Sequence, residues 1–141
     1  KILILSDRRQ HCIELGKELE KSHNILYGLY LGGMKEDMLK ISNTKQVILA
    51  TYTMASEGYD NPSLDTLILA TSRGNIEQSI GRILRKVNQN KPLVIDFVDN
   101  VEGMYGQLNK RKKFYKSKNY KIPKDPTEKK EKMNKYAFID D

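Results

Sequence analysis

The sequence NIEQSIGRILRKV occupies residues 75–87 and divides into two faces when it is read as a helix of about 100° per residue. Gln78, Arg82 and Arg85 are spaced i, i+4 and i+7, so they share one face. The other face is apolar and holds Ile76, Ile80, Ile83, Leu84 and Val87. This pattern predicts a helix that rests on a core and presents one amide and two guanidinium groups on its free side.

Gly81 stands beside this polar row, and its placement allows two interpretations. A glycine inside a helix costs about 1 kcal/mol relative to alanine, a cost that close approach of a phosphate or a second backbone would justify. Alternatively, the row is an ordinary solvated face, with Asn75 as the N-cap and Gln78 as its capping partner.

Five short apolar runs surround this helix and predict the strands of a sheet. They cover residues 2–5, 25–29, 47–50, 64–70 and 93–98. Most are continuous rather than alternating, which is typical of parallel strands buried on both faces. Helical patterns at 8–21 and 34–41 and a turn at 53–56 separate them, with Asp7 as the predicted cap of the first helix. This alternation predicts an α/β fold, an open parallel sheet flanked by helices.

Length and composition limit the class of protein. A chain of 141 residues with 38% hydrophobic residues is long enough for one domain with a real core. Cys12 is the single cysteine and cannot form an internal disulfide, which favours a reducing intracellular setting, cytoplasmic or nuclear. No run approaches the roughly 20 apolar residues of a membrane span. The chain opens directly on a strand, without a signal peptide, and we expect a piece cut at a domain boundary.

The net charge of +7 is concentrated in the last part of the chain. Residues 101–141 hold 12 Lys and Arg against 6 Asp and Glu, so we expect a compact domain at 1–100 and a basic extension at 101–141. A helix is predicted at 104–118. A basic extension favours a polyanionic partner, most simply nucleic acid. The alternatives are a solvated tail without a partner, or a segment that packs on the sheet.

Polar, small and cationic residues follow the predicted strands. Ligands of open α/β sheets gather beyond the carboxyl ends of the strands, so these residues predict one site for a phosphate-rich ligand. They include residues 6–10, 32–33, 51–53, 57–62, 72–75 and 99–100. No metal site is predicted, because two His and one Cys stand at unrelated spacings, and no nucleophilic triad is credible.

Three segments of the chain resemble motifs IV, V and VI of superfamily 2 helicases, and they occur in the same order along the chain. Motif VI resembles QSIGRILR at residues 78–85, motif V resembles residues 50–51 and 57–60, and motif IV resembles residues 2–10. The resemblance covers residues 1–99, which would be the whole second RecA-like domain. The Glu-Gly-x-Asp form of motif V and the run IGRILRK are most similar to phage recombination-repair, XPB-like and large-DNA-virus late-transcription helicases.

The resemblance implies roles for individual residues. Arg82 and Arg85 would be arginine fingers that stabilise the charge on the departing γ-phosphoryl group, and Gln78 would orient near it. Residues that would line the nucleotide cleft are Gly58, Asp60 and Gly81. Residues that would contact the nucleic-acid backbone are Ser6, Arg8, Gly32, Gly33 and Thr51, joined by Lys110, Arg111, Lys112 and Lys113 of the basic segment.

The chain also lacks parts of such a motor. It has no Gly-x-x-x-x-Gly-Lys-Ser/Thr loop and no Asp-Glu-x-His motif, which belong to a first RecA-like domain. ATP and Mg²⁺ would be held mainly by that domain, and this chain alone should be inactive. We therefore expect the C-terminal motor half of an ATP-dependent helicase or translocase, with DNA favoured over RNA. The alternatives are a non-catalytic nucleic-acid-binding module and, with thinner support, a flavodoxin- or receiver-like domain.

Overall fold

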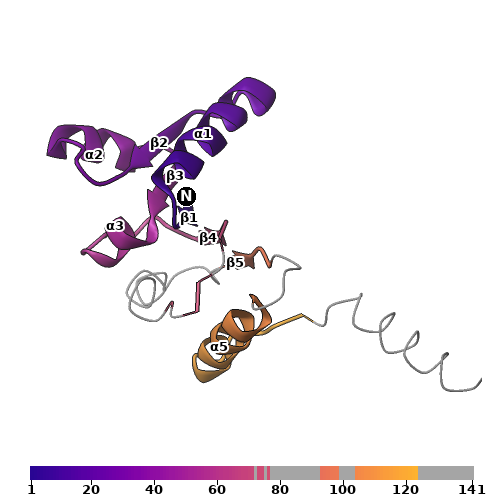
Figure 1. Ribbon diagram of the computed structural model, residues 1–141. Helices are drawn as coiled ribbons and strands as arrows, with labels where there is room; N and C mark the ends of the chain where they lie inside the picture. Colours follow the sequence, from indigo (N-terminus) through magenta and orange to yellow (C-terminus); the bar gives the residue numbers. More distant parts are fainter. Residues whose placement is uncertain (72, 75, 77–92, 99–103, 124–141) are drawn as a thin grey trace, which may run out of the picture.

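The computed structural model describes residues 1–71, 73–74, 76, 93–98 and 104–123. In this part of the chain, five parallel strands form one sheet in the order β2-β3-β1-β4-β5 (Figure 1). Their bounds are β1 Ile2–Ser6, β2 Tyr27–Tyr30, β3 Val47–Thr51, β4 Thr66–Leu69 and β5 Leu93–Asp96. Each strand lies within or close to a predicted apolar run, and the predicted α/β parallel sheet is confirmed.

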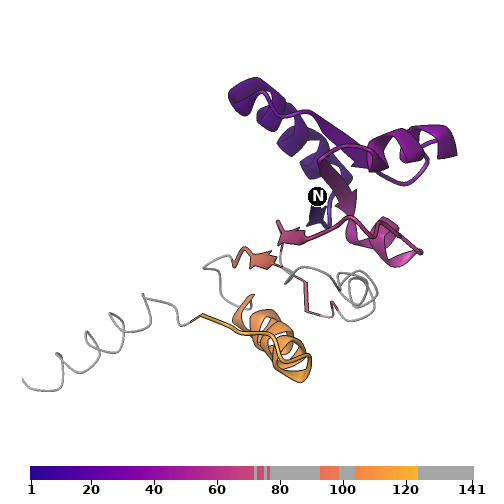
Figure 2. The same cartoon turned by 180° about the vertical axis from the view of Figure 1, so that it is seen from behind.

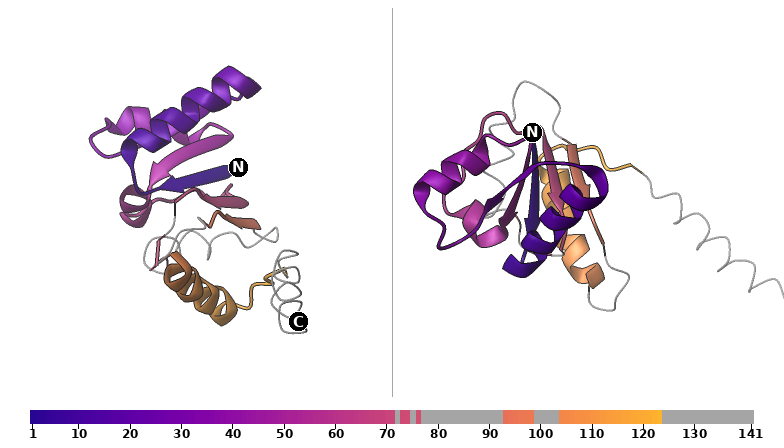
Figure 3. Two further views of the ribbon diagram at one scale, coloured as in Figure 1. Left: turned by 45° about the vertical axis from the view of Figure 1, so that its right-hand side comes forward. Right: turned by 90° about the horizontal axis from the view of Figure 1, so that it is seen from above.

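The described helices cover the two faces of this sheet. Their bounds are α1 Arg9–His23, α2 Glu36–Asn43, α3 Tyr52–Ser56 and α5 Met104–Ser117. Seen from above, α1 lies on one side of the strands and α5 on the other (Figure 3). The short turn predicted at 53–56 is a helix of five residues.

The register of the strands places one row of apolar side chains on each face. Leu3 pairs with Ile48 on one side and with Leu67 on the other, so the three point to the same face. Two residues further on, Leu5 and Ala50 repeat the pattern. This face forms the larger core cluster, which α3 and α5 cover. Full burial of each such leucine contributes about 1.5–3 kcal/mol.

The opposite face packs against α1. Cys12 of α1 is fully buried against Leu49 and Leu31, and its thiol donates to the carbonyl of Ala50 (Sγ–O 3.5 Å). Burial raises the pKa of the Cys12 thiol to about 11. Gly16, one turn further along α1, lies so close to the ring of Tyr27 that a Cβ would approach it to 2.3 Å.

The start of α1 differs from the prediction. Asp7 was the expected cap, but Arg8 is the N-cap residue and makes no side-chain capping bond. The prediction is therefore wrong by one residue. Asp7 is held instead by its backbone amide, which donates to Thr71 Oγ1 (2.9 Å), and its carboxylate pairs with Arg73.

Helix α5 packs on the sheet within the same core as the first strands. Phe114 and Tyr115 are buried in the cluster that contains Leu3 and Leu5, and Tyr120 packs against it from the segment that follows. Figure 2 shows α5 beside the β5 end of the sheet. Residues 104–123 therefore pack on the sheet, as one of the alternatives left open by the sequence requires, while Lys110 and Lys113 remain exposed.

Candidate nucleic-acid and nucleotide interface

The carboxyl ends of the strands carry the candidate site, and hydrogen bonds tie their loops together. Thr71, which follows β4, accepts a bond from the Asp7 amide at its hydroxyl (2.9 Å) and one from the Tyr52 hydroxyl at its carbonyl (2.8 Å). Asp7 follows β1 and Tyr52 follows β3. The segments that resemble motifs IV and V therefore meet the loop that leads into residues 75–87.

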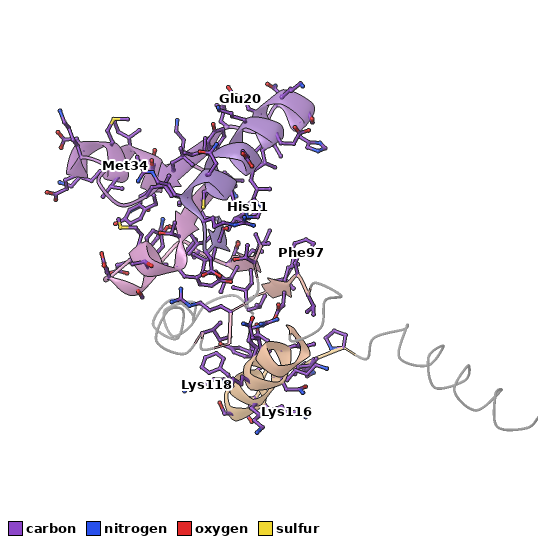
Figure 4. The ribbon with its side chains drawn as sticks, in the orientation of Figure 1. His11, Glu20, Met34, Phe97, Lys116 and Lys118 are labelled. Atoms are coloured by element: carbon purple, nitrogen blue, oxygen red, sulfur yellow. The ribbon has the colours of Figure 1, made fainter. Side chains whose placement is uncertain are left out.

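The turn after β1 contains two predicted backbone-binding residues. Ser6 is fully buried; its hydroxyl accepts a bond from the Arg8 amide (3.2 Å) and lies 2.8 Å from His11 Nδ1. Figure 4 shows His11 at the base of α1, near the strands. Ser6 therefore shapes the turn from within. Arg8 is exposed, and among the described residues its guanidinium has no partner.

The Gly32-Gly33 turn after β2 is held to the same helix. The Arg9 guanidinium donates to the Gly32 carbonyl, which fixes the turn against the first residue of α1. Gly33 has a φ of +80° and no atom within 4 Å of a Cβ built there. Both glycines are exposed, so the turn leaves open space for an approaching backbone.

Thr51 ends β3 and begins α3. It is the N-cap residue, and its Oγ1 accepts a bond from the Met54 amide (3.3 Å). The side chain is half-buried. Its hydroxyl therefore has a structural role at the start of α3, one that sequence reasoning did not assign.

Gly58 and Asp60 form an exposed turn beyond α3. Gly58 adopts a φ of +97° in open space, a conformation in which a residue with a side chain would be strained. The two residues predicted to line the nucleotide cleft therefore lie together at the surface of the domain.

The predicted catalytic residues Gln78, Arg82 and Arg85 lie outside the described residues, as does Gly81. Of the predicted helix at 75–87, Ile76 is the one residue that the structure describes. It is 1% exposed and belongs to the larger core cluster, as its place on the apolar face of 75–87 predicts.

The four basic residues predicted on α5 occupy different environments. Lys110 and Lys113 are exposed and Lys112 is half-buried, whereas Arg111 is fully buried. Arg111 Nε donates to Asp96 Oδ2 (2.7 Å) and one terminal nitrogen donates to the Arg73 carbonyl (2.9 Å). The guanidinium predicted to bind nucleic acid therefore lies in the interior. Figure 4 shows Lys116 on the side of α5 away from the strands.

Two residues at this edge, Arg73 and Tyr52, lie in the predicted ligand segments 72–75 and 51–53 but were given no individual role from the sequence. Arg73 lies over the ring of Tyr52, 5.1 Å from its centroid, and pairs with Asp7 at 3.6 Å. Burial, with Asp7 and Asp96 nearby, raises the pKa of the Tyr52 hydroxyl, which therefore remains a donor to Thr71. The one feature of the sequence that could have identified Arg73 is its position in the loop directly after a predicted strand.

Two negative findings apply to the part of the chain that the structure describes. Within it, no three His, Cys, Asp or Glu side chains are grouped as metal ligands. None of the helices in the same part is long and apolar enough to cross a bilayer.

Known proteins resemble this chain along most of its length, although no protein-family model matches it. It is 43% identical over 128 residues to a putative ATP-dependent RNA helicase of Acanthamoeba polyphaga mimivirus, covering 87% of this chain and 24% of that protein. A putative ATP-dependent RNA helicase of African swine fever virus is 32% identical over 97 residues, covering 67% and 19%. The chain thus spans about a quarter or less of the length of these relatives.

A solved structure shares the fold. Domain 2 of the DEAD-box helicase Mss116p, bound to an RNA duplex, aligns with a TM-score of 0.63 at 15% identity. The alignment covers 88% of this chain and 50% of that one. The resemblance found in the motifs therefore extends to the arrangement of the strands and helices.

Proposed function

Because this chain belongs to the C-terminal RecA-like domains of superfamily 2 helicases, we propose that it is one half of an ATP-dependent nucleic-acid motor. The observation that supports this most directly is the meeting of three loops at Thr71. A motor of this class must connect its nucleic-acid contacts to its nucleotide site, and here one edge of the sheet carries the segments assigned to both.

The nucleic-acid side would consist of the turns after β1, β2 and β3. Arg8 offers an exposed guanidinium, and the Gly32-Gly33 turn leaves room for a sugar–phosphate backbone. Such contacts position a strand without reading its sequence. Lys110 and Lys113 of α5 would add positive charge nearby, since the Lys110 side chain lies next to Gly74 in the loop after β4.

The nucleotide side would consist of Gly58, Asp60 and residues 78–85. ATP with Mg²⁺, held mainly by a first RecA-like domain, would supply the phosphoryl group whose transfer to water would drive the motor. Asp60 would accept bonds from the ribose, while Arg82 and Arg85 would stabilise negative charge on the phosphoryl group. Closure of the two domains would bring these arginines to the phosphates and exclude bulk water, leaving the attacking water molecule in the site.

The ligand in this proposal is the phosphodiester backbone, which DNA and RNA share. The motif forms favour DNA, whereas the two viral relatives carry the names of RNA helicases. A direct comparison of the two nucleic acids decides between them.

The test is steady-state ATP hydrolysis by the whole protein with single-stranded DNA, duplex DNA and RNA as stimulators. We expect stimulation by at least one of them and a loss of about 10³–10⁵ in rate in Arg82→Ala or Arg85→Ala. The chain of 141 residues alone should hydrolyse no ATP. Binding of nucleic acid without any hydrolysis by the whole protein would instead identify a non-catalytic binding module.

A further inference from the structure

The loop after β4 holds the backbone of Arg73 in a fixed position. The buried Arg111 guanidinium donates to the Arg73 carbonyl (2.9 Å), and the Tyr52 hydroxyl donates to the carbonyl of Thr71 two residues earlier (2.8 Å). Lys110 and Gln107 of α5 lie within 3.6 Å of a Cβ built on Gly74. Two hydrogen bonds therefore tie this loop to the buried side chains of Tyr52 and Arg111, and Gly74 lies beside α5.

The side chain of Arg73 is oriented by a buried ring. Its guanidinium lies over Tyr52, 5.1 Å from the ring centroid, and Tyr52 itself is 0% exposed. An aromatic ring favours a cation over its face, and a ring that cannot move fixes where that cation stands. The side chain remains 38% exposed, so the guanidinium also reaches the surface at the carboxyl edge.

The ion pair between Arg73 and Asp7 is weak and replaceable. The closest N–O distance is 3.6 Å, longer than a good hydrogen bond, and the Asp7 side chain is 46% exposed. Exposed pairs of this kind contribute little to stability. Within the described part of the chain Asp7 is the one acidic partner of Arg73, and at 3.6 Å it does not hold the planar guanidinium through two short parallel hydrogen bonds.

A fixed guanidinium with a weak, replaceable partner suits a phosphate, which accepts two parallel N–H bonds from arginine. Arg73 stands beside the turn that carries Arg8, because Asp7 bonds to Thr71 through its backbone amide. We propose that Arg73 binds a backbone phosphate of nucleic acid, and that Asp7 occupies the guanidinium until the phosphate replaces it. This inference rests on the proposed function, because it assigns a further contact to the nucleic-acid side of the same edge.

The experiment measures binding of a labelled single-stranded DNA or RNA oligonucleotide to the whole protein by fluorescence anisotropy across a salt series. In Arg73→Gln, the slope of log K against log salt should fall by about 0.7, the value for one lost phosphate contact on a single strand. Affinity should drop about tenfold. Arg73→Lys should keep the slope, since it retains the charge, but bind more weakly than the parent protein.

Asp7→Asn tests the exchange without removing the arginine. It should tighten binding about two- to fivefold, the range expected for release of one exposed ion pair. The same change in the Arg73→Gln background should have no effect. A gain that persists in that background would mean that Asp7 acts by simple repulsion, and it would overturn the exchange.

Lys21→Gln is the charge-matched control. Lys21 is exposed in the last turn of α1, which runs back from the carboxyl edge, so its loss should leave the slope unchanged. An unchanged slope in Arg73→Gln, or a raised KM for ATP at an unchanged slope, overturns the inference; the second result assigns the phosphate to the nucleotide. If the parent protein binds neither DNA nor RNA, the proposed function itself fails.

Discussion

Removing one partner of the buried ion pair between Arg111 and Asp96 should cost more stability than removing one partner of the exposed Glu36–Lys40 pair. Arg111 is 0% exposed, its Nε donates to Asp96 Oδ2 at 2.7 Å, and the Tyr115 hydroxyl donates to the same oxygen at 2.9 Å. Asp96→Asn keeps the shape but leaves a buried cation without its counter-charge. Breaking a buried pair in this way costs about 3–5 kcal/mol. The total free energy of unfolding of a domain is only about 5–15 kcal/mol, so this cost is a large fraction of it.

Urea unfolding followed by circular dichroism measures this cost. Arg111→Met combined with Asp96→Asn should recover part of it, because no uncompensated charge remains. The exposed Glu36–Lys40 pair is the matched control, since Glu36→Gln should change stability by no more than about 0.5 kcal/mol. The reasoning is refuted if Asp96→Asn costs as little as Glu36→Gln, or if the two single changes simply add in the double variant.

Three further predictions concern packing and protonation. Gly28→Ala should destabilise the chain by about 1–3 kcal/mol in urea, because its Cβ would lie 2.5 Å from a backbone oxygen of α2; Gly106→Ala, in open space, should not. Cys12 should resist thiol reagents in mildly alkaline buffer until denaturant is added, since it is buried with a pKa of about 11; rapid labelling of the folded chain would contradict this. Burial raises the pKa of Tyr59 to about 12, so its contribution to stability is complete below about pH 10 and is lost as pH rises towards 12, by up to about 1.4 kcal/mol per unit. Urea midpoints that stay constant over that range would argue against a buried hydroxyl.

The sheet was predictable because its strands are buried on both faces and leave continuous apolar runs in the sequence. The boundaries of β2 were less accurate, since the run begins at Ile25 while the strand begins at Tyr27. Leu26, inside that run, is 64% exposed. An apolar residue that precedes a strand cannot be distinguished by residue type from one within the strand. In a continuous apolar run, periodicity does not mark the boundary either.

The role of α5 was harder to predict because its inward face contains an arginine. Arg111 counts as solvent-facing in any hydropathy pattern, and only the position of Asp96 in β5 makes its burial possible. That pairing joins a helix to a strand 15 residues earlier, a separation at which neither helical nor strand spacing gives a signal.

The meeting of the polar segments at one edge of the sheet was predictable, whereas the hydrogen bonds that their side chains make were not. The segments after β1, β3 and β4 do meet at one edge, as parallel strands require. The hydroxyls of Ser6 and Thr51, predicted to contact a nucleic-acid backbone, accept hydrogen bonds from amides of their own turns. Small polar residues suit both tasks, and the sequence does not distinguish a turn-forming hydroxyl from a ligand-binding one.

The central position of β1 has a consequence for how the chain folds. Of the described strands, β1 comes first along this chain, yet it pairs with β3 and β4, and Ile2 lies opposite Val47 and Thr66. No local hairpin can therefore start the sheet, and long loops must close before the first ladder forms. Folding rates fall as contacting residues become more distant in sequence, so refolding should be slower than in helical bundles, which fold within microseconds to milliseconds. Until residue 66 has left the ribosome, the strand that will become the middle of the sheet has no second neighbour.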